Sequence, residues 1–357
     1  MTFNKNFFLG AFLSFVLLVL GAEVLLRATV PAGFWYRHFD FSGDMTSLAE
    51  LRDRIQSIHP PEGLDLLLGD SVLGASALME HRVPEARNKT LSRLLADLLK
   101  SPNHISMSLG SDGFLLPDIE GVTAEILKHP PARILLLLNF RMFAKNFNEG
   151  PNALSRNFLL GNLPLEIQKK LAPATPPTEE SQLSDRLYAA MCNHWFLFRE
   201  AQMAKTLWYY PSQKDFFQRR LEQVMGRNED QEEMAEAALK LKTADYYQAY
   251  LWDKDGLPFQ SLKQCLQQWS QMHTPVVVVL TPQNKKFLGK ALDKPSFEKN
   301  KRALASFMKL YAVRGIRYQD WSNRYPSSFF LDHCHLNFEG NQHYAGDLAE
   351  VLRGVAP

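Results

Sequence analysis

The sequence contains little cysteine: only three of its 357 residues are of this type. Cys192, Cys265 and Cys334 lie far apart, so they form no closely spaced pair of the kind that binds zinc. At most one disulfide bridge could join them, which excludes a small disulfide-stabilised scaffold. Cysteine usage therefore does not indicate whether the protein resides in a reducing or an oxidising compartment.

The sequence also lacks an excess of either charge. Forty lysines and arginines stand against 38 acidic residues, for a formal net charge of +2. A nucleic-acid-binding protein needs excess basic residues to neutralise phosphates, so the composition argues against nucleic acid as a partner. Internal repeats and low-complexity tracts are absent as well. With 46% apolar and 22% charged residues, the chain has enough apolar side chains for a full globular core.

One long apolar segment is present, and it lies near the N-terminus. Residues Phe7 to Leu26 contain a single charged side chain, Glu23, and a helix of about 20 residues spans the hydrocarbon core of a bilayer. The alternative is a cleaved secretory signal, but the segment is long for one and no small-x-small cleavage site follows it. We therefore predict a membrane anchor over residues 1–30, followed by a juxtamembrane neck over residues 31–61.

Basic residues on the two sides of this segment do not indicate its orientation. Lys5 precedes the segment, whereas Arg27, Arg37 and His38 follow it. An exported C-terminal domain is the commoner outcome for a chain that begins this way. We therefore expect the bulk of the chain on the extracytoplasmic side, in the periplasm or at the outer face of the cytoplasmic membrane.

Short apolar runs alternate with segments of helical periodicity in two parts of the chain, 62–141 and 260–357. The expected strands are Leu64–Leu68, His104–Leu109, Arg133–Leu138, Pro275–Leu280 and Ile316–Gln319. The expected helices are Thr90–Lys100, Asp118–Lys128, Gln260–Met272, Ser296–Val313 and Glu339–Leu352. This alternation predicts a three-layer α/β/α domain with a doubly wound parallel sheet, whose ligands bind beyond the carboxyl ends of the strands.

The alternation stops between the third and fourth expected strands. We interpret residues 142–259 as a helical insertion at one edge of the sheet. The insertion is rich in aromatic residues, among them Trp195 and the cluster at 208–210. An ordinary core of a helical subdomain accounts for them, and a lid, a membrane-contacting face or a docking surface for a partner are the functional alternatives.

Two short motifs carry residues suited to acyl transfer. Gly69-Asp70-Ser71 follows the first expected strand, and Asp332-His-Cys-His335 precedes the last expected helix. A serine hydroxyl becomes a nucleophile when a base such as His335 takes its proton, and Asp332 would orient the imidazole. The structural alternatives are that Ser71 caps a helix, Asp332 is a turn residue and His335 flanks a helix. The G-x-S-x-G motif of other serine hydrolases is absent.

The segment from Asp332 to His335 also contains imidazole and thiolate groups that bind zinc in other proteins. Adjacent residues rarely converge on one tetrahedral ion, and no second ligand pair is evident in the sequence. We therefore predict no metal site and no cofactor.

The two motifs together resemble those of the SGNH/GDSL hydrolase superfamily, over roughly residues 62–141 and 274–353. The resemblance implies a flavodoxin-like fold, with Ser71 as nucleophile, His335 as base and Asp332 as its orienting acid. It implies an oxyanion hole made of the backbone N–H groups of Ser71 and Gly110 and the side chain of Asn139. Gly113 is a second candidate for the glycine.

The block around Asn139 departs from that family's pattern. The family usually has Gly-x-Asn-Asp, whereas this chain has Leu-Leu-Asn139-Phe140. Arg141 follows directly, and it is either a contact for an anionic group or a solvated loop residue.

A narrower resemblance concerns the valine-rich run at 275–284, the motif at 320–322 and the Asp332 to His335 segment. These are similar to the membrane-anchored SGNH proteins of cell-envelope polymer acylation, in which an exported domain works beside a membrane-bound O-acyltransferase. The resemblance implies an exported, membrane-tethered serine esterase or O-acyltransferase that acts on an acylated glycan or lipid of the cell envelope.

Two other functions are alternatives to this one. The chain could be a non-catalytic assembly or carbohydrate-binding component that keeps the fold, although Ser71, Asp332 and His335 argue against that. A soluble intracellular lipase or thioesterase is disfavoured by the apolar N-terminus.

Overall fold

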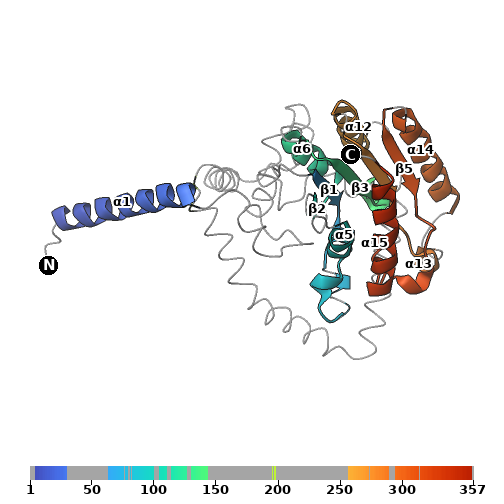
Figure 1. The fold of residues 1–357 in the computed structure, drawn as a ribbon, viewed down its shortest axis with the longest axis horizontal. Coiled ribbons are helices and arrows are strands. Elements are labelled where there is room, and N and C mark those ends of the chain that lie inside the picture. The colour runs from blue at the N-terminus through green and yellow to red at the C-terminus, as the bar shows by residue number, and fades with distance from the viewer. Residues whose placement is uncertain are drawn as a thin grey trace.

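The structure, a computed structural model, describes fourteen parts of the chain. They are residues 5–29, 63–75, 77–78, 81, 83–99, 104–110, 114–126, 130–143, 195, 197, 256–272, 274–288, 294–312 and 314–355. The predicted neck, Gly113 and nearly all of the predicted insertion lie outside the described residues. Figure 1 shows the described part as an α/β domain from which the N-terminal helix α1 extends.

A five-stranded parallel sheet forms the centre of the domain. Its strands are β1 (Gly63–Gly69), β2 (His104–Gly110), β3 (Arg133–Leu138), β4 (Val276–Leu280) and β5 (Ile316–Asp320). Their order in the sheet is β2-β1-β3-β4-β5, and every neighbouring pair is parallel. In this order the chain reverses its direction of winding between β1 and β3, and ligands of such sheets bind at that switch point.

Helices cover both faces of the sheet (Figure 1). They are α5 (Leu91–Leu99), α6 (Leu116–Ile126), α12 (Leu257–Trp269), α14 (Lys294–Ala312) and α15 (Phe338–Arg353). A further short helix, α13 (Lys285–Leu288), follows β4. Side chains of α6, α12 and α14 pack on one face of the strands, and side chains of α5 and α15 pack on the other. The domain is therefore a three-layer α/β arrangement with two hydrophobic cores.

The central strands are apolar along their whole length because both of their faces are covered. All six residues of β3 and all five residues of β4 are buried. Alternate residues of β3 belong to opposite cores: Leu136 packs with α12, whereas Leu135 and Leu137 pack with α15. Such continuous apolar runs are typical of parallel strands between two helical layers.

All five predicted strands are present, and the predicted helices of the sheet domain match the observed ones to within about three residues. The largest shift of a helix start is at α12, which begins at Leu257 instead of Gln260. Pro258 lies in its first turn, where proline is well tolerated because the missing N–H has no partner there anyway. The short helix α13 was not predicted.

One buried ion pair joins the sheet to the last helix. Arg133 at the start of β3 donates from Nε and Nη2 to the two carboxylate oxygens of Asp65 in β1, at 2.6 and 2.7 Å. Its Nη1 donates to the carbonyl oxygen of Leu352 near the end of α15, at 2.6 Å. The three contacts fix α15 against the amino ends of two strands, at the opposite end from the predicted site.

The N-terminal helix α1 spans Lys5–Thr29. Its segment Phe12–Thr29 has a mean hydropathy of 1.9, and 6% of it is buried against the rest of the protein. By length and composition this helix can cross a membrane, which agrees with the predicted anchor. Glu23 near its end accepts hydrogen bonds from Arg27 Nε and from the backbone N–H of Leu197.

Candidate active site

Ser71 lies directly beyond the carboxyl end of β1, in a short 3-10 turn, η1 (Ser71–Leu73). Gly69 lets the chain turn tightly there, because a Cβ atom at this position would lie 3.0 Å from Leu73 and 3.3 Å from Leu137. The buried carboxylate of Asp70 accepts a hydrogen bond from the N–H of Val72 at 3.2 Å and so caps the turn. The local structure therefore holds the Ser71 hydroxyl at the end of the strand.

His335 lies in the loop before α15. Asp332 orders this loop, because its Oδ1 accepts hydrogen bonds from the N–H groups of Cys334 and His335, at 2.9 and 2.7 Å. The N–H of Leu331 donates to the carbonyl oxygen of His335, which closes the loop. The side chain of Asn337 then caps α15 by accepting from the N–H of Gly340.

The two distant motifs meet in space. Ser71 Oγ lies 2.8 Å from His335 Nε2, although 264 residues separate the two along the chain. On the other side of the ring, Nδ1 lies 2.7 Å from Asp332 Oδ2. With Nδ1 donating to the carboxylate, the Nε2 lone pair accepts the hydroxyl proton of Ser71. The three predicted residues thus form a continuous hydrogen-bonded series in the order that acyl transfer requires.

The surroundings of Asp332 and His335 favour their charged forms. Burial by itself would raise the pKa of Asp332, but the charge and hydrogen bonds of His335 outweigh it and hold the pKa well below its usual range. Burial by itself would lower the pKa of His335, but Cys334 and Asp332 raise it well above its usual value. A raised pKa strengthens the imidazole as a base.

The residues predicted for the oxyanion hole follow the carboxyl ends of the neighbouring strands. Gly110 ends β2 and pairs with Gly69 of β1 in the sheet register. Asn139 directly follows β3 and is fully buried. Its Oδ1 accepts from the N–H of Arg141 at 3.2 Å, whereas its Nδ2 has no hydrogen-bond partner among the described residues. A buried donor without a partner is costly, and at a reactive site it suits a developing anion.

Arg141 is not the solvated loop residue that the sequence left open as one alternative. It lies in the 3-10 turn η3 (Phe140–Phe143) after β3, and its side chain is only 15% exposed. Nε donates to Asp70 Oδ2 at 2.9 Å, and Nη2 donates to Ser71 Oγ at 3.0 Å. Sequence reasoning missed the contact with the serine, because only the strand order brings the end of β3 beside the end of β1.

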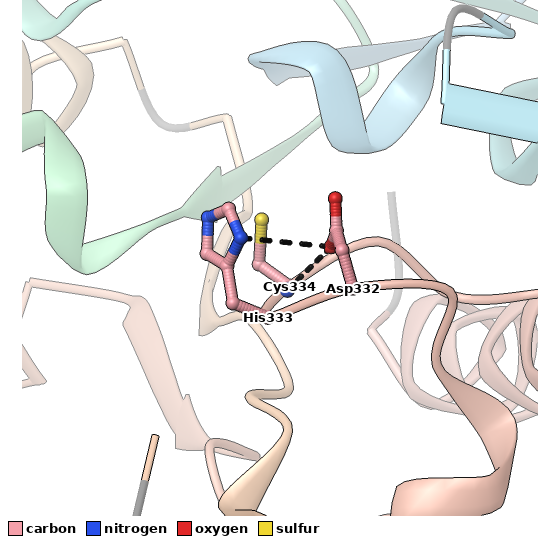
Figure 2. Close-up of side chains that lie close together, drawn as sticks. All are labelled: Asp332, His333 and Cys334. Carbon is pink, nitrogen blue, oxygen red and sulfur yellow. Dashed lines mark hydrogen bonds and ion pairs between the residues drawn. The ribbon is translucent and has the colours of Figure 1, made fainter. Parts of the chain in front are cut away.

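The sequence analysis predicted no metal site because adjacent residues rarely converge on one ion. In the structure, however, the side chains of three consecutive residues do lie close together: Asp332, His333 and Cys334. One ligand atom of each lies within 4.8 Å of the others, and Figure 2 shows the His333 ring and the Cys334 sulfur on the same side as the carboxylate. Both oxygens of Asp332 are already engaged, however, by two backbone N–H groups and by His335. A metal ion here would compete with the hydrogen bonds that orient His335, so the arrangement favours the triad.

A small cavity lies beside the triad, between η1, the residues after β4 and the start of α15. Val72, Thr281, Cys334 and Tyr344 are among its lining residues, and its volume is about 10 Å³. That is about the space of one water molecule. The cavity is therefore too small to hold an acyl group.

Comparison with known proteins adds no family to these observations. No family model matches the chain, and no curated protein matches it. The functional assignment of this site accordingly rests on its residues and their geometry.

Proposed function

We propose that the protein is a membrane-tethered, exported serine esterase or O-acyltransferase of the SGNH type. The observation that carries this proposal is the 2.8 Å contact between Ser71 Oγ and His335 Nε2, with Asp332 bonded to the far side of the ring. The position of the site supports it too, because β1 and β3 flank the switch point at which ligands of such sheets bind.

The geometry supports a two-step reaction through an acyl-enzyme. Ser71 Oγ attacks the carbonyl carbon of an ester while His335 Nε2 accepts the hydroxyl proton. The buried side-chain amide Nδ2 of Asn139, with the backbone N–H groups of Ser71 and Gly110, would bind the oxygen that gains the negative charge. His335 then protonates the leaving oxygen, and it later activates water or an acceptor hydroxyl to release the acyl group. Hydrolysis and transfer differ only in that second acceptor.

The membrane helix supports the choice of substrate class. By length and composition α1 can cross a membrane. In this proposal the catalytic domain joined to it works close to the membrane surface, where acylated glycans and lipids of the envelope lie. In this proposal a membrane-bound O-acyltransferase is the partner that supplies or receives the acyl group. The proposal needs the domain on the extracytoplasmic side of the membrane.

Labelling with a fluorophosphonate probe tests the nucleophile. The full-length protein in detergent micelles should react with the probe, and Ser71→Ala should abolish the reaction. Ser270→Ala is a matched control, because this serine caps the end of α12 through a bond to Gln267 and is not part of the site. A wild-type protein that folds but does not react would contradict the proposal and favour a non-catalytic binding component.

A phosphatase fusion tests the location. Alkaline phosphatase joined after residue 60 is active only outside the cytoplasm, so the proposal expects an active fusion. A control fusion placed before α1 should be inactive, because its phosphatase lies in the cytoplasm if the helix spans the membrane in the proposed orientation. An inactive fusion after residue 60 would remove the envelope substrate from the proposal.

A further inference from the structure

Arg141 contacts the nucleophile in a way that the triad does not explain. The guanidinium lies 3.0 Å from Ser71 Oγ and 2.9 Å from Asp70. We propose that Arg141 is a catalytic residue whose positive charge stabilises the tetrahedral intermediate formed on Ser71. This inference rests on the acyl transfer proposed above and adds a charged group to the oxyanion site.

The guanidinium is held in place from behind by a buried carboxylate. Asp70 is fully buried; one of its oxygens accepts from the N–H of Val72, and the other accepts from Arg141 Nε. A buried carboxylate is stable only when it is paired, so the ion pair fixes both partners. Because guanidinium is planar and presents its donors as a rigid fork, fixing Nε also fixes the direction of Nη2. Arg141 is thereby oriented towards the serine before any substrate binds.

The contact gains strength as the reaction proceeds. When His335 is neutral, Ser71 Oγ donates to its Nε2 and accepts from Arg141, so the guanidinium faces a neutral hydroxyl before attack. Once His335 takes the proton, negative charge grows on the reacting atoms beside that cation. A charged donor binds an anion more strongly than it binds a neutral oxygen. An interaction that is stronger in the transition state than in the ground state is one that accelerates the reaction.

The charge can pass from the serine oxygen to an atom that Arg141 also reaches. Attack forms the bond between Oγ and the carbonyl carbon, moves the hydroxyl proton to His335 Nε2 and places the π electron pair on the carbonyl oxygen. That oxygen is bonded to the same carbon as Oγ, so it forms close to the donor that already contacts Oγ. When the electron pair returns, the bond to the leaving oxygen breaks and Nε2 supplies its proton.

The charges of the site favour this role over recognition of an anionic substrate. Arg141 and Asp70 neutralise one another, and Asp332 adds a further negative charge beside His335. These side chains therefore supply no surplus positive charge to attract an anion from solution. A cation that is already paired still stabilises charge that forms within hydrogen-bond distance of it.

Kinetics on a small neutral ester tests the inference. We expect Arg141→Ala to lower kcat for p-nitrophenyl acetate about 100-fold, the effect of losing one oxyanion donor, with little change in KM. Labelling by the fluorophosphonate probe should slow in parallel. Added guanidinium ion should restore part of the activity of this variant. Arg93→Ala is the matched control, because its ion pair with Asp97 lies on the surface of α5, and it should behave as the wild type.

A second variant, Arg141→Lys, tests the same inference if Arg141→Ala does not fold. Arg141→Lys retains a positive charge for Asp70, but an ammonium group cannot reproduce the two-directional fork, so kcat should still fall at least tenfold. Wild-type kcat in either folded variant would overturn the inference. So would a rise in KM confined to anionic esters such as p-nitrophenyl hemisuccinate, because that result indicates substrate recognition. A wild-type protein that neither turns over the ester nor reacts with the probe would instead overturn the proposed function itself.

Discussion

Asp332 binds His335 with both of its carboxylate oxygens. Oδ2 accepts from the ring Nδ1 and Oδ1 accepts from the backbone N–H, each at 2.7 Å. One carboxylate therefore orients the imidazole and also shapes the loop that carries it. The bonds on the two oxygens are separable by mutation, because asparagine keeps one oxygen for the backbone while its amide group replaces the other.

Asp332→Asn should lower kcat by about 10³- to 10⁴-fold, since the amide cannot stabilise the imidazolium and favours the wrong tautomer. Its melting temperature should change less than that of Asp332→Ala, which also loses the two backbone hydrogen bonds on Oδ1. The measurements are kcat on p-nitrophenyl acetate and thermal unfolding of the same preparations. Equal kcat values for Asp332→Asn and the wild type would contradict the role of Asp332 in orienting the imidazole and stabilising its charge.

The activity of the protein should rise with pH, with a midpoint above 6.5. His335 must be neutral to accept the serine proton, and its pKa lies well above its usual value. Cys334, whose Sγ is 3.7 Å from His335 Nδ1, is one of the groups that raise the pKa of His335. Cys334→Ala should therefore move the midpoint of the activity profile to lower pH. The profile of kcat/KM against pH measures both values. Cys265→Ala, which removes a thiol from the opposite core, should leave the midpoint in place.

Glu120 should make the fold less stable as the pH rises. This carboxyl group is buried in α6 beside α12; burial raises its pKa to about 7, against a smaller opposing effect of the Ser261 hydroxyl. Because the folded state holds the proton more tightly than the unfolded state, its contribution to stability is complete below pH 4.5. It is lost as the pH rises through about 7.

Glu120→Gln tests this pH dependence. The variant should be more stable than the wild type at pH 8 by about 3 kcal/mol, because glutamine has no charge to bury. At pH 4 the two proteins should differ much less. Denaturant unfolding at the two pH values gives both differences, and an identical difference at pH 4 and pH 8 would refute the assignment of the titrating group.

Removing one partner of the ion pair between Arg133 and Asp65 should destabilise the fold strongly, whereas replacing both partners with apolar side chains should destabilise it much less. Arg133→Met leaves the Asp65 carboxylate buried without its bidentate partner and should destabilise the fold by about 3–5 kcal/mol. The double variant Asp65→Leu/Arg133→Met removes both charges and should recover most of that loss. Unfolding in denaturant measures the free energies, and a double variant as unstable as Arg133→Met would contradict the prediction.

Two glycines of α15 should respond in opposite ways to alanine. A Cβ atom at Gly340 would lie 2.5 Å from the carbonyl oxygen of Phe329, so Gly340→Ala must displace the segment that precedes the Asp332 loop. We expect a loss of about 1–3 kcal/mol and a lower kcat. Gly346 is the matched control: a Cβ atom there meets nothing within 4 Å, so Gly346→Ala should stabilise the helix by up to about 1 kcal/mol. Thermal unfolding and kcat distinguish the two.

The strands and helices were predictable because each depends mainly on the pattern of apolar residues within its own segment. The runs that became β3 and β4 are short and apolar along their whole length, a composition typical of strands between two helical layers. The helix α1 was predictable for a similar reason, because its apolar length is itself the physical property that lets it span a membrane. Ser71, Asp332 and His335 were identifiable as candidates from their residue types and their positions beside these elements.

The contacts that join distant segments were decided by the tertiary structure. The sequence by itself did not set the 2.8 Å approach of Ser71 to His335, because it depends on α15 packing against the same face of the sheet as α5. The role of Arg141 depends on β3 lying beside β1 in the sheet, and burial of Glu120 depends on α6 facing α12. Local composition determines which segments become strands and helices. Only their packing determines which side chains meet, because that choice minimises the free energy of the whole domain and not of any one segment.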